Sequence, residues 1–277
     1  MKPDLPLAAT TFGFLYRCSR DEAFRQIAAA GYQLVELAAG PPHLDLSAMG
    51  ADARADVKSG LNKHGLNCVS TNPLELNPIT ANPDLSEATY RQYRAAIELS
   101  ADLGATNVVM ISGRMSPLVP MPLPQAKDLL RNQLDRLVPI SRKLGVTLSI
   151  EAVPYGFLQT ATEIEQFIDE FDLTGVGITL DCANLHFVGS DSVTELNDHC
   201  TKVSVVHISD SWRHRWAHTQ VGHAEIDFAA IGATLQRLQF QGPTVYELAD
   251  AEDPAPRLRS DWDSLSEWGW TASTSTA

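Results

Sequence analysis

Four ionisable side chains stand at or near the ends of apolar segments in the second half of the sequence. Glu151 closes TLSIE, Asp181 closes VGITLD, His207 follows VSVV, and Glu247 closes PTVYE. Short apolar segments rich in β-branched residues predict buried strands. A single histidine after one strand is more often a satisfied core residue than a ligand, but ionisable groups after four successive strands indicate one shared site.

Three carboxylates and an imidazole at one edge would repel one another and shift their pKa values unless a cation lay among them. We therefore expect one divalent metal ion held by four ligands, Glu151, Asp181, His207 and Glu247. Oxygen ligands with a single nitrogen favour Mn²⁺, with Mg²⁺, Co²⁺ and Zn²⁺ as alternatives. Such a site keeps coordination positions free for the oxygens of a substrate.

The elements that must position these residues follow a repeating strand-then-helix pattern. Strands are predicted at 7–12, 33–37, 66–71, 107–111, 147–151, 176–181, 203–208 and 243–247. Helices are predicted at 19–30, 47–64, 86–103, 125–144, 162–171, 193–200, 228–238 and 257–268. A long polar and aromatic loop is expected to follow the seventh strand.

Eight such units predict a closed (β/α)₈ barrel, a single TIM-barrel domain over 1–277 with 270–277 as a frayed tail. In this architecture the catalytic groups stand at the carboxyl ends of the strands. An open doubly wound sheet is the alternative. That fold often carries a glycine-rich phosphate turn after its first strand, whereas this chain has FGFLYRCS there.

Composition narrows the classes of partner. The 277 residues carry a formal charge of −13, which disfavours nucleic acid, and the only basic cluster, at 213–218, suits one small ligand. The four cysteines form no C-x-x-C pair, and neither a signal peptide nor an apolar membrane span is recognisable. We expect a cytoplasmic protein that acts on a small molecule without a membrane, and a homo-oligomer stays open.

Several segments together resemble one family, the sugar phosphate isomerases and epimerases of the xylose isomerase-like barrel type. The family includes ketose 3-epimerases, hydroxypyruvate isomerase and inosose dehydratase. The resembling segments are AAGYQLVEL, ADLGATNVV, IEAVP, LDCANLH, VHISD and VGHAEIDF. They occur in this order over most of the chain, and the combination is far more specific than any one of them.

The resemblance implies roles for individual residues. It assigns the same four metal ligands, makes Glu151 and Glu247 the catalytic acid/base pair, and makes Arg213 a substrate contact. Asn184 stands where many members have histidine, so it is expected to bind a sugar oxygen without acting as a charged acid. Apart from the resemblance, the sequence offers further candidates for substrate binding: Trp212, Trp216, His186, Glu36, Asn72 and Glu75. Histidines that a three-zinc nuclease of this family would need are missing.

These features predict a metal-dependent isomerase or epimerase of a small keto sugar or hydroxy-carbonyl compound. A glutamate would remove a proton next to a carbonyl, and the metal would stabilise the resulting enediolate. The same intermediate could expel a hydroxyl or an aglycone, so a dehydratase or lyase is the alternative. A sugar-binding barrel without catalysis is a second alternative, which the retention of all four ligands disfavours.

Overall fold

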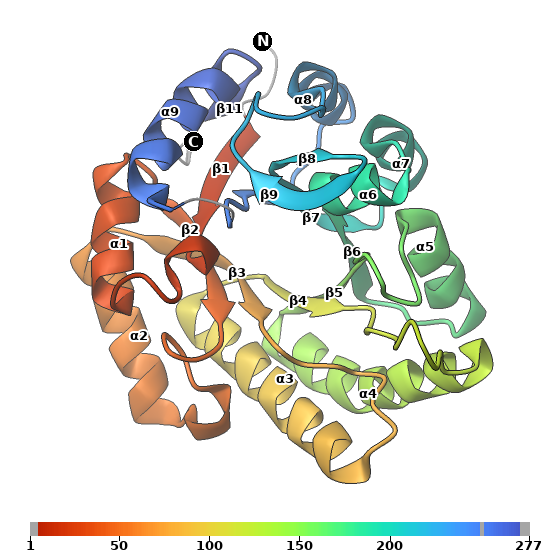
Figure 1. Cartoon of the computed structure of the whole chain (residues 1–277). Coiled ribbons are helices and arrows are strands. Elements are labelled where there is room, and N and C mark those ends of the chain that lie inside the picture. The colour runs from red at the N-terminus through yellow and green to blue at the C-terminus, as the bar shows by residue number, and fades with distance from the viewer. Residues whose placement is uncertain (1–4, 250–251, 272–277) are drawn as a thin grey trace.

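The computed structural model, which describes residues 5–249 and 252–271, contains a closed barrel of eight parallel strands (Figure 1). Neighbouring strands follow chain order, and β1 closes the barrel by pairing with β10. The strands are β1 Leu5–Thr10, β2 Leu34–Ala39, β3 Asn67–Pro73, β4 Asn107–Ile111, β5 Thr147–Glu151, β6 Val176–Asp181, β7 Val203–Ile208 and β10 Thr244–Tyr246. The predicted (β/α)₈ fold is confirmed, and the open sheet is wrong.

Helices surround the barrel and cover its outer face (Figure 1). They are α1 Arg20–Ala29, α2 Ala51–Lys63, α3 Pro83–Leu103, α4 Leu123–Leu144, α5 Ala161–Glu170, α7 Ser192–His199, α8 Phe228–Arg237 and α9 Pro254–Ser266. Their ends follow local chemistry: Ser19 accepts the N–H of Glu22 at the start of α1, and Gly104 ends α3 in the left-handed conformation. Within the described part of the chain, no helix combines the length and apolar character that crossing a membrane requires.

Two segments of the chain form elements that the sequence did not predict. The short helix α6 (Cys182–Val188) begins directly after β6, with the Asp181 carboxylate accepting the N–H of Asn184 as its N-cap. The expected loop after β7 contains an antiparallel hairpin, β8 (Asp210–Trp212) and β9 (Arg215–Thr219), which forms its own two-stranded sheet. Both elements lie over the same part of the barrel (Figure 1).

The end of the chain also differs from the expectation of a frayed tail over 270–277. Trp270 and Thr271 form β11, which pairs in parallel with Leu5 and Pro6 of β1. The Trp270 side chain is fully buried in the main apolar core, and burying an indole of this size is strongly favourable. The remainder of the expected tail, 272–277, lies outside the described residues.

A small apolar layer fills the barrel below the carboxyl ends of its strands. Ala8, Leu34, Val205 and Val245 form this separate buried cluster inside the barrel. Because side chains along a strand alternate between its two faces, the residues two positions further on point into the barrel as well. Those residues are Thr10, Glu36, His207 and Glu247. The strand periodicity therefore places polar groups directly above an apolar floor.

Helix α4 should contribute strongly to stability through its buried face. Leu137→Ala removes a fully buried side chain from the core and should lower the free energy of unfolding by about 2–5 kcal/mol. Leu144→Ala, at the end of the same helix with the side chain 39% exposed, should cost much less. Chemical denaturation of both variants measures the difference, and equal losses would show that burial in α4 is not what matters.

Candidate active site

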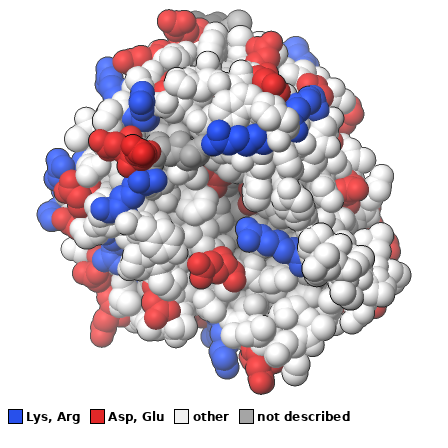
Figure 2. Space-filling model, in the orientation of Figure 1, with Lys and Arg blue, Asp and Glu red and all other residues white. Residues whose placement is uncertain are grey.

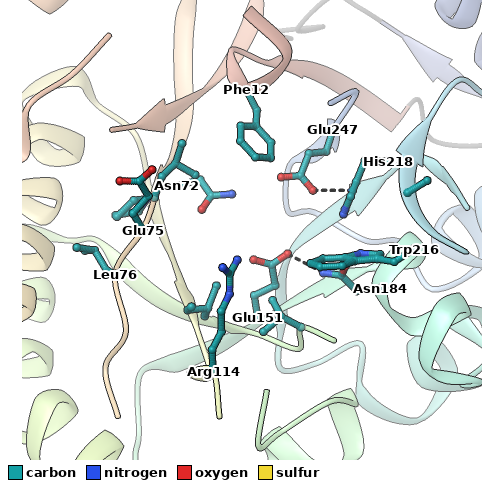
Figure 3. A pocket seen from close by; sticks show the side chains of 15 residues that line it. Phe12, Asn72, Glu75, Leu76, Arg114, Glu151, Asn184, Trp216, His218 and Glu247 are labelled. Carbon is teal, nitrogen blue, oxygen red and sulfur yellow. Dashed lines mark hydrogen bonds and ion pairs between the residues drawn. The ribbon is translucent and has the colours of Figure 1, made fainter. Parts of the chain in front are cut away.

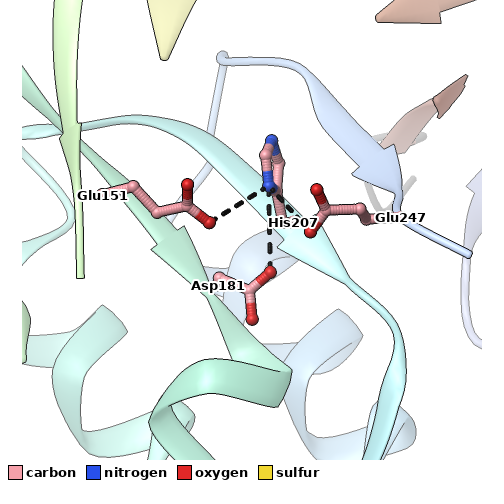
Figure 4. A group of neighbouring side chains, drawn as sticks. All are labelled: Glu151, Asp181, His207 and Glu247. Carbon is pink, nitrogen blue, oxygen red and sulfur yellow. Dashed lines mark ion pairs between the residues drawn. The ribbon is translucent and has the colours of Figure 1, made fainter. Parts of the chain in front are cut away.

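Four side chains converge above the apolar floor of the barrel (Figure 4). Glu151 and Asp181 are the last residues of β5 and β6, His207 lies in β7, and Glu247 directly follows β10. Each offers one ligand atom, and these atoms all lie within 4.8 Å of one another. All four residues are buried, with Asp181 and His207 completely inaccessible. The structure thus brings together the four residues expected to share one site.

The distances centre on one imidazole nitrogen. His207 Nδ1 lies 3.3 Å from a Glu247 oxygen, 3.7 Å from Glu151 Oε1 and 3.8 Å from Asp181 Oδ2. Among the residues that the structure describes, neither His207 Nδ1 nor Asp181 Oδ2 has a hydrogen-bond partner, although both are buried. Unpaired buried polar atoms are costly, so atoms left in this way point to a missing common partner. One divalent cation with bonds of about 2.0–2.2 Å fits this donor set.

Burial and the close charges of the cluster shift the pKa values of its members. Burial raises the pKa of Asp181 to about 8, against the opposing effect of His218. Burial lowers the pKa of His207, but the Glu36 and Glu247 carboxylates outweigh burial and hold that pKa well above its ordinary value. Burial raises the pKa of Glu247, but the charges of His207 and His218 outweigh burial and hold that pKa well below its usual range. Protons partly replace the charge that a metal ion would supply.

Glu36 has a different place from the one expected. It was predicted to contact substrate, but its side chain is completely buried next to His207. Its carboxylate accepts hydrogen bonds from His207 Nε2, at 3.0 Å, and from Ser70 Oγ, at 2.6 Å. With an ion bound, this contact keeps the proton on Nε2 and directs the Nδ1 lone pair into the cluster, the usual role of a carboxylate behind a metal-binding histidine. Because side chains alternate along β2, Glu36 faces the barrel interior like Leu34, and this pattern could have predicted its position beside His207.

A pocket of about 320 Å³ opens above the cluster (Figure 3). It contains six of the expected site residues: Glu151, Glu247, Asn72, Asn184, Glu75 and Trp216. Among the other side chains that line it are Phe12, Arg114 and His218. Figure 2 shows a hollow in this face of the molecule, with acidic and basic side chains near its edge. Polar groups and aromatic faces in one concave site are typical of a small-molecule pocket.

Asn184 is held between the hairpin and the metal cluster. Its Nδ2 donates to Glu151 Oε1 and to the carbonyl of Ala152, both at 3.2 Å. Its Oδ1 accepts the indole N–H of Trp216 at 2.8 Å. The amide orientation is therefore fixed from both sides, and Asn184 positions the Glu151 carboxylate in addition to lining the pocket.

Three expected substrate contacts do not line the pocket. Arg213 lies at the hairpin turn and donates to the carbonyl of His186, while the His186 ring pairs with Glu225 at 3.1 Å. Trp212 packs against Arg215 and His214. The expectation for Arg213 came from its distance after His207, but the chain between them turns into the hairpin and carries residue 213 away from the pocket. The structure gives these three positions no support as substrate contacts.

The hairpin instead brings His218 to the site. Its Nδ1 lies 3.2 Å from Glu247 Oε2 and shares a hydrogen bond with Ser209 Oγ at 3.0 Å. Asp181 and Glu247 outweigh burial and raise the pKa of His218 to about 9. Trp216 and His218 share one face of β9, so a prediction of β9 as a strand would have grouped them. Arg114, in the loop after β4, had no comparable signal in the sequence.

Comparison with protein families identifies a family model that matches most of the chain. The model for the family described as xylose isomerase-like TIM barrel matches residues 24–268. A ketose 3-epimerase of Arthrobacter globiformis is 27% identical over 171 residues, which cover 59% of this chain and 56% of that protein. A 3-dehydro-D-guloside 4-epimerase of Escherichia coli is 26% identical over 180 residues, covering 61% and 67% of the two chains. This chain thus matches little more than half of the first relative.

Solved structures agree on the fold. A 3-keto-D-glucoside 4-epimerase from Escherichia coli, in its apo form, superposes with a TM-score of 0.80 at 21% identity. The superposition covers 95% of this chain and 99% of that one. At this identity the similarity establishes the barrel fold and its topology.

The pKa shifts predict how the stability of the metal-free protein depends on pH. Asp181 and His218 have native pKa values of about 8 and about 9, both raised from ordinary values of 3.8 and 6.5. Between pH 6.5 and 8 the native state therefore binds more protons than the unfolded state, and the free energy of unfolding should fall as the pH rises.

Excess Mn²⁺ should abolish this fall, because the cation replaces the protons, and should raise stability by about 2.7 kcal/mol at a hundredfold excess over Kd. Denaturation at pH 6.5, 7 and 8, in chelator and in Mn²⁺, measures both effects. The metal site would be refuted if no divalent cation changed stability at any of these pH values, or if Asp181→Asn responded as strongly as the unaltered protein.

Glu36 should tune metal affinity from behind His207. Glu36→Gln keeps the volume of the side chain but removes the charge that fixes the imidazole, so Mn²⁺ should bind about 10–100-fold more weakly. Calorimetric titration of metal into the apo protein measures this directly. Glu87→Gln, an exposed glutamate of α3, is the matched control. Unchanged affinity in Glu36→Gln would mean that Glu36 only fills space.

Proposed function

Because this chain belongs to the xylose isomerase-like TIM barrel family, we propose that it is a metal-dependent epimerase or isomerase of a keto sugar. One observation carries the proposal. Of the four clustered residues, only Glu151 and Glu247 also line the pocket, whereas Asp181 and His207 are completely buried. These two carboxylates can therefore contact both a cation and a substrate. Proton transfer at carbon requires such a base within reach of the substrate.

A divalent cation in the cluster would supply positive charge next to the substrate carbonyl and so make the neighbouring C–H acidic enough for a carboxylate. Glu151, Asp181, His207 and Glu247 would hold it. The four residues offer three carboxylates and one imidazole, which also fits Mn²⁺ as the ion we favour, with Mg²⁺, Co²⁺ and Zn²⁺ as alternatives.

The two glutamates approach the pocket from different strands. Glu151 comes from β5 and Glu247 from the end of β10, and Figure 3 shows them on different sides of the pocket. One carboxylate would remove the proton next to the carbonyl, and the other would return a proton to the opposite face of the resulting enediolate, giving the epimer. Asn184 holds the Glu151 carboxylate in place for this step, and His218 contacts Glu247.

The rest of the pocket suits a sugar. Asn72 and Asn184 offer amide groups to hydroxyls, and Trp216 and Phe12 offer aromatic faces to the apolar side of a ring. The named activities of the relatives, 3-epimerisation and 4-epimerisation of keto sugars, are consistent with this chemistry. Substrate and partner are thus proposed to be a small carbohydrate.

Exchange of substrate hydrogen with solvent tests the proposal. The Mn²⁺-loaded enzyme in D₂O should incorporate one deuterium next to the carbonyl of a ketose or a keto-glycoside and form its epimer or isomer, as NMR detects. Glu151→Gln and Glu247→Gln should each lower the rate by about 10²–10⁴-fold, and Glu87→Gln should not change it. Metal content must be measured in each variant, because both glutamates are proposed ligands.

Two results would contradict this mechanism. Full activity in both variants with normal metal content would exclude the two-carboxylate chemistry. A product lighter by one water, formed without epimer, would assign the protein to the dehydratases instead.

A further inference from the structure

Two opposite charges stand at the mouth of the pocket on neighbouring loops. Arg114 follows β4 and Glu75 follows β3, and both side chains are exposed and line the pocket (Figure 3). Within residues 5–249 and 252–271, neither the Arg114 guanidinium nor the Glu75 carboxylate makes a hydrogen bond or ion pair. The chain pairs many of its other surface charges, for example Arg136 with Glu87. These two groups are therefore free to bind a ligand.

The backbones that carry the two charges are tied together. Asn77, two residues after Glu75, donates through Nδ2 to the carbonyl of Arg114 at 3.1 Å. Its Oδ1 accepts the backbone N–H of Arg114, also at 3.1 Å. One amide thus fixes the loop after β3 against the loop after β4, and it holds the backbone segments that carry Arg114 and Glu75 close together before a ligand binds.

Further contacts hold the same loops. Gly113 has a φ of +114°, and a Cβ there would lie 2.6 Å from the Ile79 side chain, so only glycine fits the approach to Arg114. Arg114 also forms an isolated antiparallel bridge with Gly156, in the loop after β5. Glu75 itself adopts a φ of 61°, a conformation that costs a non-glycine residue about 1–3 kcal/mol. Such preorganisation reduces the entropy lost when a ligand binds.

The pairing of an arginine with a glutamate selects among ligand groups. Guanidinium only donates hydrogen bonds and carboxylate only accepts them, whereas a hydroxyl does both. A phosphate or carboxylate on the ligand would satisfy Arg114 but would meet repulsion from Glu75 and from the acidic cluster below. The formal charge of −13 adds to this repulsion at long range. Neighbouring hydroxyls of an uncharged sugar satisfy both groups at once.

We propose that Arg114 and Glu75 form a second subsite, which binds the hydroxyls of a neutral sugar unit attached to the reacting keto sugar. The inference rests on the proposed function and specifies its substrate class as a keto-glycoside without phosphate or carboxylate. The reacting unit lies at the bottom of the pocket, between Glu151 and Glu247, and the attached unit lies at the exposed mouth.

Binding and turnover by charge-altered variants test the subsite. The probes are a keto-disaccharide such as 3-ketolactose, D-fructose as a neutral ketose of one unit, and D-fructose 6-phosphate. The Mn²⁺-loaded enzyme should bind the keto-disaccharide most tightly. Arg114→Met and Glu75→Gln should each weaken that binding by about 10-fold or more, while binding of D-fructose stays within about twofold. Arg91→Met, an exposed arginine of α3 outside the pocket, is the matched control.

The experiment separates this inference from the proposed function. Calorimetry measures affinity without requiring turnover. Weaker binding of the keto-disaccharide in the two variants therefore supports the subsite even if the enzyme exchanges no deuterium. In that case only the proposed epimerase chemistry is refuted. Unchanged affinity in both variants, with turnover still abolished by Glu247→Gln, overturns the subsite alone. Tightest binding of D-fructose 6-phosphate, increased further by Glu75→Gln, would show that the mouth of the pocket binds an anion.

Discussion

The repulsion among three buried carboxylates is the constraint on which the site depends. Glu151, Asp181 and Glu247 lie almost without solvent around one imidazole, in a region where each negative charge raises the cost of the next. Burial raises the pKa of Asp181, and the Asp181 and Glu247 carboxylates outweigh burial to raise the pKa of His218, so protons partly offset the negative charge. The energetic cost of this cluster indicates that it binds a divalent ion.

The barrel provides the cluster without special local structure. Parallel strands deliver their last inward-facing residues to one ring, and the apolar layer of Ala8, Leu34, Val205 and Val245 closes the barrel directly below. Additional polar residues then orient the ligands. Glu36 holds His207 from behind and Asn184 holds Glu151 from the side, so both side chains are oriented toward the centre of the cluster.

The parts that the sequence predicts well are those governed by periodicity. The predicted bounds of β4 to β7 agree with the structure, because short apolar segments rich in β-branched residues indicate buried strands. The four clustered residues follow from that pattern. Other parts of the pocket wall do not, because the position of His218 depends on the β8–β9 hairpin and that of Arg114 on the Asn77 amide, which is far away in the sequence. Such tertiary contacts leave no local periodicity in the sequence.

The closing contacts of the barrel have a consequence for biosynthesis. The first strand, β1, pairs with β10 and with β11, whose residues are separated from it by nearly the whole chain. During translation β1 emerges long before β10 and β11, so one of its edges stays unpaired until those strands have been synthesised. Closure of the barrel is thus a late, long-range event. Since Glu247 directly follows β10, the metal cluster is completed only in that same final step.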